Sequence, residues 1–199
     1  ISVWDFMTDW QLSLQGYGRS LLSFIFPAWF LQGPRPVTLA RWDRLNQKQK
    51  VMGFGELDNH ASTKKILGIP FVAHSFNRAF RFVRTHVLTA EKLNGDYQKD
   101  REAILQALLY GRVYFALEYF RAAHGFSFWF EQENKKYHMG DKITLGKFST
   151  QLHVALPAKA LVRVICNGGL WIEETATNFS RMVDKPGIYR VEVYLQSYG

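Results

Sequence analysis

The chain has 199 residues, of which 47% are hydrophobic and 21% are charged, and its formal net charge is +8. This composition is typical of a globular protein and excludes a disordered chain. The length provides enough chain for one large domain or two small ones, each with a buried core. The single cysteine, Cys166, excludes an internal disulfide framework and a zinc site made of several cysteines.

The first residues give two expectations about what surrounds the chain. It begins at Ile1 without the charged-then-apolar pattern of a signal peptide, and we expect it to be a piece of a longer protein. The longest apolar stretch, residues 21–31, is interrupted by Pro27 and is shorter than the ~18 apolar residues of a membrane span, so we expect no membrane partner. We expect this stretch to pack against upstream residues or a second copy of the chain, because an exposed apolar patch favours aggregation.

The next segment predicts a helix followed by a strand. Thr38 is of a residue type that caps helices. Three apolar residues follow it at helical spacing, namely Leu39, Trp42 and Leu45. Residues 51–54 then form a short apolar run that predicts a buried strand. A helix followed by a buried strand is the repeating step of an α/β layer or barrel.

A second helix is expected over residues 76–87, with one apolar and one basic side. The apolar side would consist of Phe76, Phe80 and Val83. Arginines recur every three residues on the other side, at Arg78, Arg81 and Arg84. A basic strip attracts phosphate groups or nucleic acid, whereas the simpler interpretation is a solvated helix face. Because the aromatic residues lie on the buried side and not between the basic residues as stacking platforms, we expect no nucleic-acid partner.

A third helix, over residues 99–110, is expected to end at Gly111. Beyond it, short runs of alternating apolar and polar residues are separated by turn signals, as at 126–130, 152–156, 162–166 and 188–195. Asn167-Gly168 supplies the positive φ angles of a tight hairpin. About seven short strands at this spacing indicate an antiparallel β-sandwich. Its aromatic residues are expected to fill the core, although exposed ones would be able to bind sugars or a partner.

The stretch that carries chemistry is residues 51–61, where an apolar run leads into Asp58-Asn59-His60. Ligands and metals are held at the carboxyl ends of strands in α/β folds. In extended backbone, residues i and i+2 point the same way, so Asp58 and His60 would present an oxygen and a nitrogen ligand together. The alternative is an aspartate that caps the next helix, with a neighbouring surface histidine.

Two segments together resemble the last metal-binding motif of the polymerase-and-histidinol-phosphatase (PHP) superfamily. They are residues 41–45, Arg-Trp-Asp-Arg-Leu, and the later Gly55-x-x-Asp58-Asn59-His60-Ala61. Further stretches are similar to the family in its own order, at 80–88, 107–114, 139–141 and 186–193. The last two resemble the β-rich C-terminal extension of the carbaryl-hydrolase-like branch. The resemblance extends from about residue 38 to the end.

This resemblance implies an α+β chain in which the C-terminal portion of a PHP-type α/β barrel is followed by an immunoglobulin-like antiparallel β-sandwich. The domains would be residues 1–98 and residues 99–199. Asp58 and His60 would help to hold divalent zinc, manganese or iron, and such a cluster polarises a phosphoryl or acyl oxygen and activates a bound water. The substrate would be a small phosphoester or related ester. Arg81 and Arg84 are candidates for binding a substrate phosphate through bidentate contacts.

The sequence departs from the family because no histidine precedes His60, so the family's N-terminal His-x-His is missing. Even a catalytic zinc needs three protein ligands, so two cannot complete the site. We therefore expect the metal in the complete protein, no firm site in this chain alone, and little or no hydrolase activity. The expected partners are the missing N-terminal half or a second copy. The alternative function is a non-catalytic β-sandwich module that binds a partner or a glycan. His74 and His86 are further candidates near the metal, and a structural role is the simpler interpretation of each.

Overall fold

The computed structural model describes residues 1–14, 22–23, 26–61, 63–66, 68–72, 74–146 and 148–195. It combines helices with antiparallel sheets, as expected of an α+β chain. The chain forms two compact units that interleave along the sequence. Unit 1 contains residues 1–39, 53–86 and 113–122, and unit 2 contains residues 40–52, 87–112 and 123–199. The expected linear boundary between residues 98 and 99 stays a prediction.

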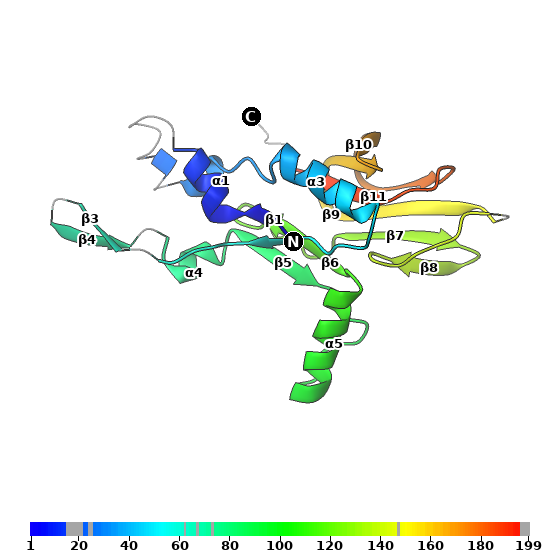
Figure 1. The fold of residues 1–199 in the computed structure, drawn as a ribbon, viewed down its shortest axis with the longest axis horizontal. Coiled ribbons are helices and arrows are strands. Elements are labelled where there is room, and N and C mark those ends of the chain that lie inside the picture. The colour runs from blue at the N-terminus through cyan, green and yellow to red at the C-terminus, as the bar shows by residue number, and fades with distance from the viewer. Residues whose placement is uncertain are drawn as a thin grey trace. The chain divides into compact units, whose positions relative to one another are not determined.

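Unit 1 is made of short elements (Figure 1). In chain order they are β1 (Ser2–Asp5), α1 (Phe6–Leu12), η1 (Pro27–Trp29), the start of α3 (Pro36–Asn46), β2 (Phe54–Glu56), β3 (Thr63–Ile66), β4 (Ile69–Val72), α4 (Phe76–Ala79), β5 (Val83–Val87) and β6 (Val113–Leu117). The strands β1 and β2 pair in parallel, with helices in the connection between them. This parallel pair with a helical crossover is the step that α/β proteins repeat. Two further pairs, β3–β4 and β5–β6, complete the strands described for this unit.

The strand β2 also lies against β5, and a glycine makes the close approach possible. The Thr85 hydroxyl donates to the Gly55 carbonyl oxygen at 2.9 Å and accepts from the Gly55 N–H at 3.1 Å. A Cβ atom on residue 55 would lie 2.6 Å from Val83 Cγ1 and 3.0 Å from Phe115 Cβ. Any larger residue there would therefore push β2 away from β5 and β6.

The core of unit 1 collects apolar residues from distant parts of the chain. The buried members are Trp4, Phe6, Ala28, Phe82 and Val83, with Leu57, Phe115 and Leu117 packed against them. The rings of Phe6 and Phe82 stack with their centroids 4.8 Å apart. Large rings bury the most apolar area per residue, so this small unit depends on a few aromatic contacts.

Three sequence-based expectations for unit 1 are wrong in detail. The helix expected over residues 76–87 stops at Ala79, and Val83–Val87 is the strand β5. Helical spacing was misleading here, because Phe76 and Phe80 are 52% and 60% exposed while β-branched residues of β5 pair with β6. The helix α3 begins at Pro36 and not after Thr38, since proline fits the first helical turn. The expected strand at 51–54 is β2, which begins only at residue 54.

The apolar stretch 21–31 is described only in part, because residues 21, 24 and 25 lie outside the described residues. Pro27 and Ala28 are buried, whereas Phe26 and Trp29 are 46% and 72% exposed. A covering partner for this stretch stays a prediction. No helix in the described ranges is long and apolar enough to cross a bilayer.

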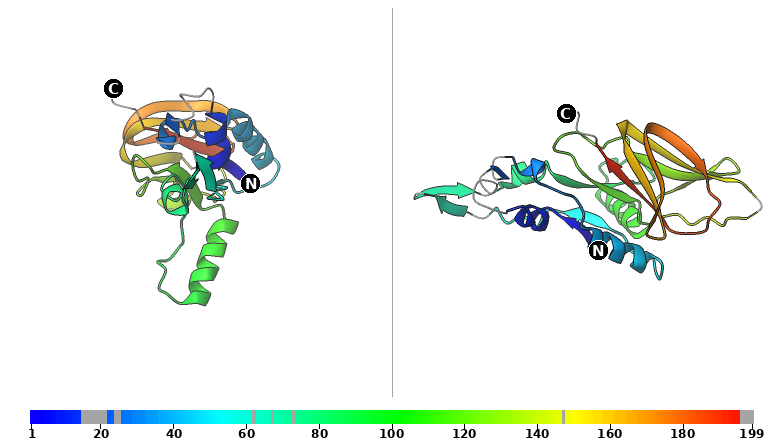
Figure 2. Two further views of the ribbon diagram at one scale, coloured as in Figure 1. Left: turned by 90° about the vertical axis from the view of Figure 1, so that its left-hand side faces the viewer. Right: turned by 90° about the horizontal axis from the view of Figure 1, so that it is seen from above.

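Unit 2 is built around one long strand. Besides the end of α3 it contains α5 (Tyr97–Leu109), β7 (Ser127–Gln132), β8 (Lys135–His138), β9 (Thr150–Cys166), β10 (Gly169–Met182) and β11 (Tyr189–Tyr194). The sheet has the order β10–β9–β7–β8, and β11 also pairs with β9. All of these pairs are antiparallel. Figure 2 shows β9 (yellow) and β10 (orange) curving together.

The two halves of β9 have different neighbours and share one core. Residues 150–155 pair with β7, and residues 161–166 pair with β11. Between them lies Pro157, which has no N–H to donate, and there the β10 register shifts. Leu152 and Val162 are fully buried members of the same apolar cluster, so the sheet folds over onto itself.

Several sequence-based expectations for unit 2 are confirmed, but the separate short strands expected at 152–156 and 162–166 are one continuous strand, β9, so the sheet has fewer and longer strands than expected. The alternating residues Phe126, Phe128 and Phe130 contribute to the core. Asn167 and Gly168 adopt φ angles of 51° and 84° in the tight turn between β9 and β10. The helix α5 matches the one expected from residue 99, and it begins earlier because the Asp96 carboxylate caps it. Gly111 follows with a φ of 66°.

A partly buried ion pair attaches the end of α3 to β11 within unit 2. Arg190 donates to both carboxylate oxygens of Asp43, from Nε at 2.8 Å and from Nη2 at 2.9 Å. It also pairs with Glu192, and its guanidinium lies over the Trp42 ring. Burial opposes the charged form of Arg190, but the hydrogen bonds to Asp43 and Glu192 outweigh it and raise the pKa of Arg190.

Candidate functional site

The loop that follows β2 holds the two predicted metal ligands. Leu57 packs against the core of unit 1, so the start of the loop is fixed. Asp58 and Ala61 have φ angles of 44° and 47°, in the left-handed region. An alanine in this conformation costs about 1–2 kcal/mol relative to ordinary backbone. Such strained backbone in the middle of a short loop is typical of a functional segment.

The side chains of Asp58 and His60 meet. His60 Nε2 lies 3.3 Å from Asp58 Oδ1, and the two side chains are 78% and 59% exposed. They come together through the left-handed turn at Asp58, and not through extended backbone as the sequence suggested. One carboxylate oxygen and one imidazole nitrogen are therefore presented to solvent within reach of one ion.

The residue between them anchors the loop. Asn59 Nδ2 donates to the carbonyl oxygen of His74 at 2.6 Å, and Asn59 Oδ1 accepts from the Ala61 N–H at 3.2 Å. Because the Asn59 side chain points inward to His74, the side chains of Asp58 and His60 on either side of it point outward. This contact could not be predicted from the sequence, because the hairpin of β3 and β4 separates Asn59 from His74.

His74 is a buried support and not an exposed ligand. Its side chain is 2% exposed and packs edge-on against Phe6, Trp10 and Phe82 at ring distances of 5.4, 4.4 and 6.4 Å. Burial, and secondarily the charge of Arg78, lowers the pKa of His74 to about 4. The imidazole is therefore neutral at neutral pH, as the structural interpretation requires.

A second polar cluster lies on the β5–β6 pair. The carboxylate of Glu118 is 5% exposed and contacts His86 Nε2 at 2.9 Å and Arg84 Nη1 at 3.1 Å. His86 also stacks on the Tyr114 ring at 4.3 Å. Burial, and secondarily the charge of Glu118, raises the pKa of the Tyr114 hydroxyl.

The contacts with Glu118 give His86, and one nitrogen of the Arg84 guanidinium, a structural role in this cluster. Val83 and Thr85 approach Gly55 of β2, so the alternating residues Arg84 and His86 are on the opposite face of β5. Arg84 also donates from Nε to the Phe80 carbonyl oxygen at 2.8 Å. Binding of a phosphate by Arg84 stays a prediction, as does binding by the exposed Arg81.

Sequence reasoning missed Glu118. The signal available was a carboxylate directly after the apolar run 113–117, the same pattern that drew attention to Asp58 after β2. Its partners lie more than thirty residues away along the chain, so only the fold identifies them.

Within the ranges that the structure describes, no three His, Cys, Asp or Glu side chains are grouped closely enough to hold a metal ion. Asp58 and His60 are therefore two candidate ligands without a third such side chain beside them in the described residues. Comparison of the chain with models of protein families, with curated proteins and with solved structures gives no match.

Proposed function

We propose that this chain is the C-terminal portion of a metal-dependent hydrolase that resembles the PHP superfamily and acts on a small phosphoester or related ester. Asp58 and His60 supply part of the metal site. The observation that carries the proposal is the exposed pair of Asp58 Oδ1 and His60 Nε2, 3.3 Å apart, in a strained loop directly after a strand of a parallel pair.

The fold supports this proposal in two places. The helical crossover between the parallel strands β1 and β2 is the step expected in the last part of an α/β barrel, where ligands lie after the carboxyl ends of strands. The folded antiparallel sheet of unit 2 is compatible with the immunoglobulin-like sandwich that the resemblance implies for the C-terminal part.

The donor chemistry fits zinc, manganese or iron. A carboxylate oxygen and an imidazole nitrogen are ligands that all three ions accept. When bound, such an ion lowers the pKa of a water molecule and polarises the ester. This chain contributes a carboxylate oxygen through Asp58 and an imidazole nitrogen through His60, and the hydrogen bond from Asn59 to His74 anchors the loop that carries both. Further ligands have to come from another chain segment or another copy.

The test is a titration of the 199-residue chain with ZnCl₂ and MnCl₂, followed residue by residue by NMR. We expect metal-dependent changes centred on residues 57–61, with an affinity weaker than micromolar. Asp58→Asn and His60→Gln should abolish them, whereas the control His124→Gln, at another exposed histidine, should not. Hydrolysis of p-nitrophenyl phosphate should be absent or negligible.

Two results would contradict the proposal. Absence of any change at residues 57–61 would remove the assignment of Asp58 and His60 as ligands. Stoichiometric zinc binding with micromolar affinity by this chain alone would show that the site is complete, against the two-ligand geometry.

A further inference from the structure

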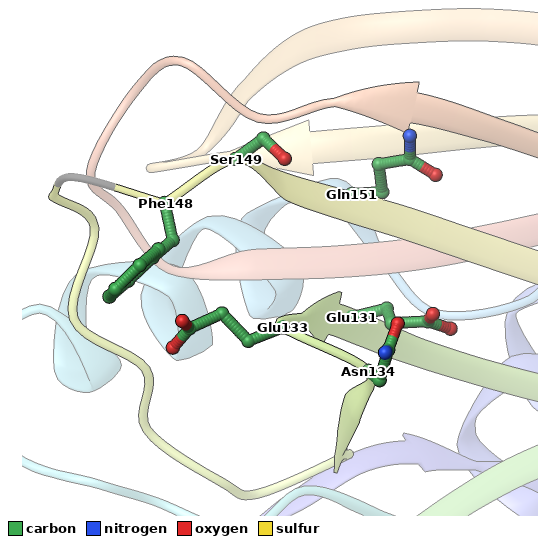
Figure 3. Close-up of a pocket in the computed structure, with 6 residues that line it drawn as sticks. All are labelled: Glu131, Glu133, Asn134, Phe148, Ser149 and Gln151. Atoms are coloured by element: carbon green, nitrogen blue, oxygen red, sulfur yellow. The ribbon is translucent and has the colours of Figure 1, made fainter.

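Unit 2 carries a polar cavity of about 300 Å³ on the outer side of its sheet (Figure 3). Six residues line it, namely Glu131, Glu133, Asn134, Phe148, Ser149 and Gln151. They come from the end of β7, the turn that follows it and the start of β9. The cavity is open to solvent, so a ligand would lie on the surface of the sheet and not be enclosed.

The lining is held by regular backbone pairing. Glu131 of β7 lies directly opposite Gln151 of β9 in the antiparallel register. Their sequence neighbours Phe130 and Leu152 point the other way, into the core. The backbone that carries Glu131 and Gln151 is therefore already fixed before a ligand binds.

The turn between β7 and β8 forms another wall. Glu133 and Asn134 have φ angles of 50° and 61°, as in a two-residue hairpin turn. Asparagine adopts this conformation readily, but glutamate does so rarely. The strained backbone therefore places the Glu133 side chain at the rim of the cavity.

The lining chemistry favours a neutral ligand rich in hydroxyl groups. Two carboxylates accept hydrogen bonds, two amides both donate and accept, and one serine hydroxyl does the same. Lysine, arginine and histidine are absent from these six lining residues, although the whole chain carries a formal charge of +8. An anion such as phosphate would face the two carboxylates and be repelled.

The lining of the cavity also includes one exposed aromatic ring. Phe148 is 52% exposed, and Figure 3 shows its ring at the same end of the cavity as the Glu133 carboxylate. The flat face of an aromatic ring packs on the C–H face of a sugar, while hydrogen-bonding groups around it fix the hydroxyls. The carboxylates of Glu131 and Glu133 extend in opposite directions in Figure 3, which is unfavourable for a shared metal ion.

Two stacked aromatic rings, Trp129 of β7 and His153 of β9, lie on the same face of the sheet. Trp129 stacks on His153 with ring centroids 5.0 Å apart and planes 7° apart, and His153 Nε2 lies 3.9 Å from Glu131 Oε2. The Lys136 ammonium also lies over the Trp129 ring, 5.1 Å from its centroid, so a sugar would have to displace it to reach this ring.

We propose that this cavity binds a neutral oligosaccharide, with one sugar ring on Phe148 and its hydroxyl groups on Glu133, and with the next sugar unit on Glu131 and Gln151. This site belongs to unit 2 alone and does not depend on the hydrolase proposal. For the alternative function, a non-catalytic β-sandwich module, this cavity would be the binding site.

The experiment measures binding of tetrasaccharides to the 199-residue chain by calorimetry and NMR. The probes are four neutral ones, cellotetraose, xylotetraose, mannotetraose and chitotetraose, and one anionic one, tetragalacturonate. We expect saturable binding of at least one neutral probe, with NMR changes at residues 131–134 and 148–151, and no binding of the anionic probe.

Two variants test the contacts. Phe148→Ala and Glu131→Gln should each weaken binding at least about tenfold, which corresponds to the loss of one good contact. The matched control is Phe76→Ala, since Phe76 is also 52% exposed but belongs to unit 1, and it should leave binding unchanged. Phe148 is exposed, so its removal should leave the fold intact, which NMR spectra of the variant will verify.

Several outcomes would overturn the proposal. They are failure of all four neutral probes, equal binding of tetragalacturonate, or binding that Phe148→Ala and Phe76→Ala affect equally. Changes at residues 131–134 on addition of CaCl₂, without changes on addition of any sugar, would identify a cation site instead.

Discussion

The two units of this chain reach a buried core in different ways. In unit 2, one strand supplies much of the core, because alternate residues of β9 from Leu152 to Val164 face inward. In unit 1, Phe6 and Phe82 stack although they are far apart in the chain, and the strands around them have three to five residues. The comparison shows that local periodicity specifies unit 2, whereas unit 1 depends on long-range aromatic contacts.

The difference also concerns the candidate sites. The Asp58–His60 pair lies on a strained loop of unit 1 that one side chain, Asn59, anchors to His74. The cavity of unit 2 has paired strands as its base. We therefore expect the loop of Asp58 and His60 to be more sensitive than the cavity of unit 2 to changes in the packing beneath it.

The largest effect is expected at the centre of unit 1. Phe82 is fully buried and stacks on Phe6 and on Tyr119, at 4.8 and 5.1 Å. Phe82→Ala should lower the free energy of unfolding by about 3–5 kcal/mol, because it leaves a cavity in a small core. Urea denaturation measures this loss, and hydrogen exchange should show lost protection in β5 and β6.

The control is Phe80→Ala at a 60% exposed position, where the change should stay within about 0.5 kcal/mol. An equal loss of hydrogen-exchange protection in β9 of the Phe82→Ala variant would contradict the contrast between the two units, because it would show that they unfold together.

The next effect concerns pH. The pKa of His74 is about 4 in the folded chain and near 6.5 when unfolded. At pH values between about 4 and 6.5, the unfolded chain binds a proton at His74 that the folded chain does not bind. The free energy of unfolding therefore falls as the pH is lowered from about 6.5 toward 4. The loss should reach at most about 3 kcal/mol, from 1.36 kcal/mol per pKa unit.

Denaturation curves at pH 7, 5.5 and 4.5 measure this dependence in the native chain and in His74→Phe. The variant keeps a ring but cannot titrate, so the difference between the two chains isolates His74 from the other ionisable groups. Identical pH dependence would mean that His74 is not buried as a neutral group.

A smaller effect is expected in unit 2. Arg190→Lys removes the two-point contact with Asp43 but keeps the charge, and should cost about 1–2 kcal/mol by thermal or urea unfolding. Arg163→Lys is the matched control, because its pair with Glu173 is much more exposed and should contribute close to nothing. Equal effects of the two substitutions would refute a stabilising contact between α3 and β11.

The sequence predicted unit 2 better than unit 1. Alternation identified Phe128 and Leu152 as core residues, and Asn167-Gly168 identified the hairpin, because both signals are local. The continuation of β9 through Pro157 was not predicted, since a proline inside an apolar run argues against a continuous strand and only the pairing with β10 extends across it.

The candidate sites were predicted to the extent that their residues are close in sequence. Asp58 and His60 meet because one residue separates them. The carboxylate of Glu118 and its partners Arg84 and His86 become neighbours only through the β5–β6 pairing. The helix expected over 76–87 failed because Phe76, Phe80 and Val83 match helical spacing by coincidence, and the strand pairing of β5 outweighs that weak preference.

The central position of β9 decides where this chain can be divided. It contributes backbone hydrogen bonds to β7, β10 and β11, so every other described strand of that sheet except β8 joins it directly. New chain ends placed at the turn of Asn167 and Gly168 would leave β9 whole. Two fragments separated there would carry complementary edges, with β9 on one and β10 and β11 on the other. The turn is therefore the natural place for a split version of this protein that reassembles from its parts.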